Sequence, residues 1–148
     1  MQAAARARRR RVKAWSLRYL LIWLALAVAA IGNGILREST YGTGLPELVA
    51  HQLSTVTGIL FTGVVAFLLC RRRPPRSAGQ AWAIGVFWLL LTLVFEFGFG
   101  HYVAGHSWER LLADYNILAG RVWPVFLIWV LLLPVLIFRY THHAATKT

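Results

Sequence analysis

Acidic residues and cysteines are scarce in this chain of 148 residues, which contains five Asp or Glu side chains and one cysteine. The single cysteine, Cys70, excludes an intramolecular disulfide. Only 14% of the residues are charged, compared with about a quarter in an ordinary soluble domain. Because 58% are hydrophobic, more than a soluble fold of this size could bury, the composition indicates a protein that spans a membrane.

Sequence signatures of common catalytic sites are also missing. We find no nucleophile motif, no metal-ligand triad and no glycine-rich phosphate loop, and the glycines of residues 98–105 follow no strand of a dinucleotide-binding unit. These absences favour a protein that is not an enzyme. One enzymatic alternative stays open, in which Glu96 or a histidine acts as general base on an amphipathic substrate while Arg37 or Arg121 holds a phosphate.

Basic residues are abundant, and their positions alternate along the chain. The net charge of +11 would suggest nucleic acid as a partner if it covered a soluble surface. Thirteen of the sixteen Lys and Arg residues instead lie before residue 19, in the loop at 71–76 or in the C-terminal tail. All five acids belong to the opposite side. The positive-inside rule then predicts an even number of spans with both termini in the cytoplasm, with a lipid bilayer as partner and no nucleic acid.

Four apolar runs predict an all-α fold, a bundle of four transmembrane helices. Residues 1–14 form a basic arm, expected to be disordered or to lie on anionic lipid headgroups, and residues 15–148 form a single membrane domain. A short amphipathic helix over about 107–118 is expected to lie at the outer interface. The predicted spans are residues 15–36, 48–70, 81–99 and 122–138.

Local residue types add detail to these spans. The basic arm and first span also resemble a signal peptide with a small-residue cleavage pattern at 27–29, although the helical pattern continues to Arg37, which favours retention. The third span is expected to end after Gly98 and Gly100, and Pro134 predicts a kink in the fourth. Close helix packing is predicted for a ladder of small residues in the second span, formed by Ser54, Gly58, Thr62 and Ala66.

Polar side chains from all four spans are expected near the outer third of the bilayer. Among them, the carboxylate of Glu96 costs several kcal/mol at membrane depth unless it is paired. In the simplest interpretation Arg37 or Arg121 pairs with Glu96, while Asn33 and Gln52 form hydrogen bonds across helices. The predicted cluster consists of Asn33, Arg37, Glu38, His51, Gln52, Glu96, His101 and Arg121.

Two other interpretations use the same residues. As part of a transporter or channel, Glu96 would be a proton or cation site with His51 or His101 as its relay partner. A haem held by His51 and His101, or zinc at His101 and His106, is a further possibility. The histidines fall at helix ends rather than within the bundle, and the sequence therefore predicts no cofactor.

Four strings of the sequence resemble a family of small bacterial inner-membrane proteins with about four spans. They are NGILRE (33–38), AHQLST (50–55), FEFGFGHYVAGHSWERLLADYN (95–116) and GRVWP (120–124). The resemblance implies the bacterial inner membrane as location and supplies no activity, cofactor or catalytic residue. We therefore expect a small accessory or assembly protein whose outer polar cluster recognises a partner or a small ligand, as a homo-oligomer or within a larger membrane complex.

Overall fold

The computed structural model describes the backbone of residues 2–145 and the side chains of residues 16–143. This part of the chain is helical and contains no strand. The elements in order are α1 (Gln2–Ser39), η1 (Tyr41–Thr43), α2 (Glu47–Cys70), α3 (Ala78–Tyr102), α4 (Trp108–Ala113), η2 (Ile117–Ala119) and α5 (Trp123–Ala145). Helices α1, α2, α3 and α5 are long and apolar enough to cross a membrane. The prediction of an all-α, multi-pass membrane protein is thus confirmed.

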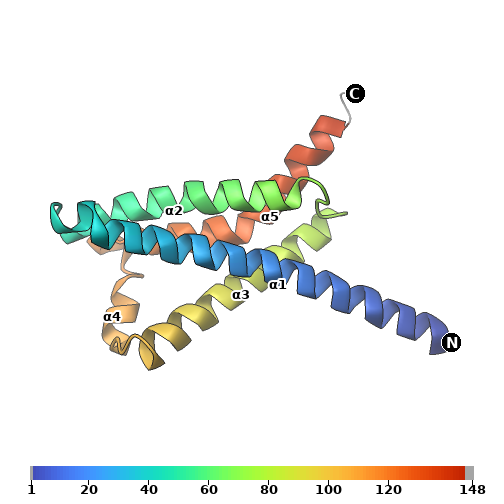
Figure 1. Ribbon diagram of the computed structural model, residues 1–148, viewed down its shortest axis with the longest axis horizontal. Coiled ribbons are helices and arrows are strands. Elements are labelled where there is room, and N and C mark those ends of the chain that lie inside the picture. Colours follow the sequence, from blue (N-terminus) through green and yellow to red (C-terminus); the bar gives the residue numbers. More distant parts are fainter. Residues whose placement is uncertain (1, 146–148) are drawn as a thin grey trace.

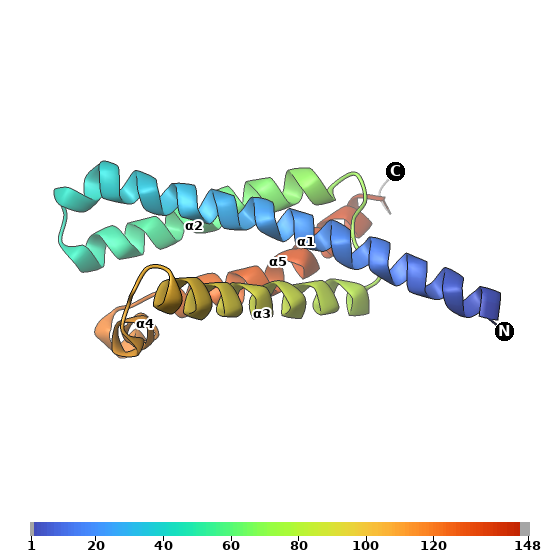
Figure 2. The ribbon, with the colours of Figure 1, turned by 60° about the horizontal axis from the view of Figure 1, so that its bottom comes forward.

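The four long helices form two antiparallel pairs, α1 with α2 and α3 with α5 (Figures 1 and 2). Both chain ends and the α2–α3 loop lie at one end of the bundle, which we call the terminal end. Helices η1 and α4 lie at the other end, which we call the α4 end. Figure 1 shows that α1 and α3 cross near the middle of the bundle and diverge towards the α4 end.

The terminal half of the bundle is closely packed. Ile84 and Trp88 of α3 are fully buried, and the Trp88 indole donates a hydrogen bond of 2.9 Å to the Tyr19 carbonyl of α1. Gly85 lies directly against the backbone of Leu131 in α5, where a side chain would overlap the carbonyl oxygen. Because glycine has no Cβ, it lets α3 and α5 approach this closely.

The predicted small-residue ladder of α2 is confirmed, because all four of its members are buried. At Gly58 a Cβ would lie 3.2 Å from Asn33 Nδ2 of α1 and 3.5 Å from a ring carbon of Phe126 in α5. One turn later, the Thr62 hydroxyl accepts a hydrogen bond of 3.2 Å from the Trp129 indole. The ladder therefore packs α2 against both of its neighbours.

Helix α3 ends at Tyr102, soon after Gly98 and Gly100 as predicted, and three residues beyond the predicted bound at residue 99. At Gly100 a Cβ would lie 2.8 Å from Leu111 Cδ2, so this glycine makes room for α4 instead of ending α3. Helix α4 begins after Ser107, whose side chain caps it by accepting a hydrogen bond from Arg110 N. The helix is shorter than predicted, and the 3₁₀ turn η2 occupies part of the expected range.

The outermost helices extend beyond the predicted spans. The backbone of the basic arm continues α1 back to Gln2, and its side chains lie outside those that the structure describes, so their contact with lipid headgroups stays a prediction. Helix α5 continues to Ala145 and contains the buried Pro134. Its second half turns away from the direction of its first half in Figure 1, as expected for a proline inside a helix.

Candidate functional site: a polar cavity joined to an apolar chamber

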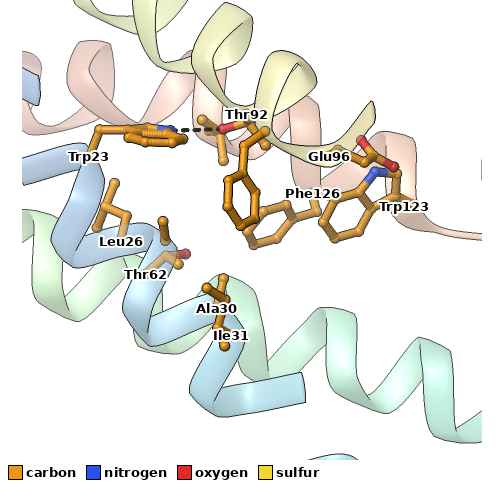
Figure 3. A pocket seen from close by; sticks show the side chains of 12 residues that line it. Trp23, Leu26, Ala30, Ile31, Thr62, Thr92, Glu96, Trp123 and Phe126 are labelled. Atoms are coloured by element: carbon orange, nitrogen blue, oxygen red, sulfur yellow. Dashed lines mark hydrogen bonds between the residues drawn. The ribbon is translucent and has the colours of Figure 1, made fainter. Parts of the chain in front are cut away.

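Glu96 lies in the last third of α3, half-buried between α3, α4 and α5. Its Oε2 accepts a hydrogen bond of 2.7 Å from the hydroxyl of Tyr115, which follows α4. The indole nitrogen of Trp123, at the start of α5, is buried and points towards the same carboxylate without completing a hydrogen bond (Figure 3). Both groups that face the carboxylate are neutral donors.

The arginines expected to pair with Glu96 have other partners. Arg37 forms an ion pair of 2.6 Å with Glu38, the next residue in the chain. Arg121 pairs with Glu47 at 2.8 Å and with Asp114 at 3.5 Å. No cation pairs with Glu96 among the described residues, and the prediction that Arg37 or Arg121 does so is wrong.

Asn33 and Gln52 form the hydrogen bonds across helices that the sequence predicts. Asn33 Nδ2 donates to the carbonyl and the hydroxyl of Ser54, at 2.7 and 3.1 Å, and Asn33 Oδ1 accepts from the Thr57 hydroxyl at 2.7 Å. Gln52 Nε2 donates to the Gly120 carbonyl at 3.0 Å. These bonds fix α2 against α1 and against the segment that leads into α5.

The two histidines of the haem hypothesis lie in different surroundings. The His51 Nε2 atom is buried without a hydrogen-bond partner. The His101 ring stacks on Trp108, with 4.1 Å between ring centroids, and its Nδ1 lies 2.9 Å from the His106 carbonyl oxygen. Within the described part of the chain, no three His, Cys, Asp or Glu side chains gather in the arrangement of a metal site.

A cavity of about 620 Å³ occupies the α4 end of the bundle. We call it the polar cavity, because charged side chains of α1, α2, α3 and α4 line it. Of the eight residues predicted from the sequence, Arg37, Glu38, His51, Glu96 and Arg121 lie in its wall, whereas Asn33, Gln52 and His101 do not. The wall also contains Glu47, His106, Arg110 and Asp114.

A second cavity of about 220 Å³ lies deeper in the bundle, between α1, α2, α3 and α5 (Figure 3). We call it the apolar chamber, because Glu96 is the one ionisable residue in its wall among the side chains that the structure describes. Phe95, Glu96 and Trp123 line both cavities, so the carboxylate lies where they adjoin. The remaining wall consists of Trp23, Leu26, Ala27, Ala30, Ile31, Thr62, Thr92, Phe126 and Val130.

Four aromatic rings line the apolar chamber, and those of Phe95 and Trp123 also line the polar cavity. Trp123 stacks on Phe126 with 4.9 Å between centroids and 15° between planes. Trp23 meets Phe95 edge to face at 6.2 Å, and its indole donates a hydrogen bond of 3.1 Å to the Thr92 hydroxyl. These contacts hold the rings of α1, α3 and α5 in place around the chamber (Figure 3).

Tyr115 is the functional residue that the sequence analysis missed. It falls within the short amphipathic helix predicted over about 107–118, and its hydroxyl reaches Glu96. Burial and the hydrogen bond to Glu96 both raise the pKa of Tyr115 well above its usual value. The phenol is therefore protonated at neutral pH and serves as a hydrogen-bond donor.

Comparison of the chain with known protein families, curated proteins and solved structures gives no match. The resemblance to small bacterial inner-membrane proteins therefore rests on the four sequence strings and stays a prediction.

Proposed function

We propose that this protein is a small membrane accessory protein that binds an amphipathic ligand. The polar part of the ligand would occupy the polar cavity, and its apolar part the apolar chamber. One observation carries this proposal, namely that a charged cavity and an almost wholly apolar one share Phe95, Glu96 and Trp123 in their walls. A ligand that fills both cavities needs a polar part for the polar cavity, joined to an apolar part for the apolar chamber.

The proposed orientation follows from the basic residues. The basic loop at 71–76 lies at the terminal end of the bundle, as do both chain ends (Figure 1). Under the positive-inside rule this end faces the cytoplasm, and the α4 end faces outwards from a bacterial inner membrane. The polar cavity would then take its ligand from the outer leaflet or from the outer surface.

Binding of a neutral amphiphile tests this proposal. The protein is placed in nanodiscs of phosphatidylglycerol, and tryptophan emission is followed while dodecyl maltoside with a bromine at the chain end is added. Bromine quenches indoles that it contacts, and Trp23 and Trp123 line the apolar chamber. We expect saturable quenching beyond the partitioning measured with a variant whose chamber is filled.

The variant Ala30→Phe fills the chamber, and Val28→Phe is its matched control. Ala30 lies in the chamber wall, whereas Val28 lies on the same helix with 69% of its surface exposed. We expect Ala30→Phe to remove the saturable quenching and Val28→Phe to keep it. Equal quenching of the wild type and both variants would contradict the proposal.

A second candidate function is transport with Glu96 as a proton or cation site. It is favoured by the position of the carboxylate, which lines both cavities and has no cationic partner among the described residues. Transport predicts a proton or cation flux in liposomes that Glu96→Gln abolishes while the protein stays folded. A flux that this substitution leaves unchanged, or no flux at all, would exclude this candidate.

A further inference from the structure

We infer that the ligand is an organic cation, an ammonium group attached to an apolar body, with its positive charge at Glu96. This inference rests on the proposed function and names the chemical class of its ligand.

Among the described residues, two charged side chains in the wall of the polar cavity form no ion pair, Glu96 and Arg110, and the wall holds four carboxylates against three arginines. Arg37 is paired with Glu38, and Arg121 with Glu47 and Asp114. Glu96 instead receives a hydrogen bond from Tyr115, a neutral donor that brings no positive charge to the carboxylate. A carboxylate has about four acceptor sites, so one bond from Tyr115 leaves it able to bind a cationic group.

The aromatic rings around Glu96 suit an organic cation better than a metal ion. Trp123 lies beside Glu96 and stacks on Phe126, whereas Trp23 meets Phe95 edge to face and lies towards the opposite end of the chamber (Figure 3). An ammonium group is attracted to ring faces, and aromatic walls are a common way to bind quaternary ammonium ligands. A hard metal ion needs several oxygen ligands, whereas Glu96 supplies the only carboxylate in the wall of the apolar chamber.

An anionic or uncharged head group fits this junction less well. An anion would bring a second negative charge next to Glu96, in surroundings that are largely apolar. An uncharged head group would leave the carboxylate without a cation, as it is in the free protein. At Glu96 itself, charge complementarity therefore favours an amphiphile with a positive head, whereas Arg110 lies elsewhere in the wall of the polar cavity.

Three amphiphiles with the same brominated dodecyl chain test the inference. They carry a trimethylammonium, a maltoside or a sulfonate head. Their binding is measured by tryptophan quenching in the phosphatidylglycerol nanodiscs described above. The quenching caused by partitioning of each compound into the lipid is measured with Ala30→Phe and subtracted. These nanodiscs contain no amine. We expect the ammonium compound to bind about tenfold more tightly than the maltoside, the effect of one partly buried charge pair. The sulfonate is expected to bind most weakly.

Substitutions at Glu96 then assign the preference to this residue. Glu96→Gln should bring the ammonium and maltoside affinities to within about threefold of each other, since the charge pair is lost. Glu109→Gln is the matched control, because Glu109 is an exposed carboxylate of α4 outside both cavity walls. Glu96→Asp keeps the charge and should keep a preference for the cation.

The outcomes separate the inference from the proposed function. If all three compounds bind with equal affinity, or if Glu96→Gln leaves the ammonium preference unchanged, the inference is wrong while the amphiphile site stands. If no compound shows saturable binding, both are wrong. Should Glu96→Gln fail to fold, the comparison of the three compounds on the wild type and on Glu96→Asp decides.

Two sources can supply such an ammonium group, namely an amine-bearing lipid headgroup or a free amphiphilic cation. Adding phosphatidylethanolamine to the nanodiscs distinguishes them. Competition with the ammonium probe would identify the lipid headgroup as a ligand, and unchanged probe affinity would identify a free cation.

Discussion

The two halves of this bundle differ in how closely their helices approach. In the terminal half, Gly85 brings α3 into backbone contact with α5, and Ile84 and Trp88 are completely buried. In the α4 half, α1 and α3 diverge, and two cavities lie between the helices. Gly85 lets the helices close on one another in the first half, whereas aromatic rings and a carboxylate line the cavities of the second half. Stability is therefore expected to reside in the terminal half and ligand binding in the α4 half.

The largest effect is expected from Gly85→Ala, which would break the closed half. The added methyl group would overlap the Leu131 carbonyl, a backbone atom that can move only with the whole of α5. We expect a loss of about 3 kcal/mol or more in the free energy of unfolding, measured by thermal or denaturant unfolding in detergent. Gly98→Ala is the control, because a Cβ there meets nothing within 4 Å. Equal stability of the two variants would contradict the close contact.

A smaller loss of stability is expected from Asn33→Ala, which tests the hydrogen bonds between α1 and α2 in the α4 half of the bundle. The substitution removes three hydrogen bonds from a buried site. We expect a loss of about 1–2 kcal/mol in the free energy of unfolding. Ser39→Ala serves as the control, because that exposed hydroxyl bonds only to carbonyl groups of its own helix. An Asn33→Ala variant as stable as this control would show that the hydrogen bonds contribute little.

Glu96→Gln should change stability least among the buried-site variants, by about 0.5 kcal/mol or less. The amide oxygen of glutamine can accept the Tyr115 hydrogen bond in place of the carboxylate. Thermal unfolding of Glu96→Gln and Glu96→Leu beside the wild type checks this, because leucine cannot accept the bond. Destabilisation by Glu96→Gln as large as that by Gly85→Ala would show that the charge of Glu96 holds the bundle together.

The smallest effect concerns Tyr115, whose hydroxyl ties the segment after α4 to Glu96 of α3. Because its pKa is raised in the folded protein, Tyr115 stabilises this tie below its usual pKa of about 10. The contribution is lost as the pH rises through the folded-state pKa. Hydrogen exchange of the α4 amides should therefore be faster in Tyr115→Phe than in the wild type at neutral pH, with little difference in global unfolding. Identical exchange in the two proteins would mean that this hydrogen bond does not hold α4.

The bundle could be predicted from sequence because its signals are local. Hydropathy marks the four spans, the four-residue spacing of Ser54 to Ala66 marks the packed face of α2, and Asn33 needed a partner on a neighbouring helix. The end of α3 was predicted three residues early, because Gly100 lies inside the helix, where it makes room for Leu111. Whether a glycine breaks a helix or admits a neighbour depends on contacts from elsewhere in the chain.

Most residues of the polar cavity were predicted from the sequence, but the partners of Glu96 were not. Five of the eight predicted residues line the polar cavity, since charge and depth along each span place them at one level. The partners of Glu96 depended on how the segment from Trp108 to Trp123 folds back over α3, which residue types alone do not determine. The sequence also gave no sign of the apolar chamber, because four helices each contribute part of its wall.

The packing of α4 on α3 links the volume of the polar cavity to the charged groups that surround Glu96. Leu111 fits against Gly100, and Tyr115 stacks on Phe97 with 5.8 Å between ring centroids. Helix α4 and Glu96 therefore move together with α3, while Arg37 is carried by α1 on the opposite wall of the polar cavity. A tilt of α3 towards α1 would narrow the polar cavity and at the same time bring Arg37 closer to the carboxylate of Glu96. The angle between α1 and α3 thus sets both the volume of the polar cavity and the distance from Arg37 to Glu96, and at a short distance Arg37 would compete with a cationic ligand for the carboxylate.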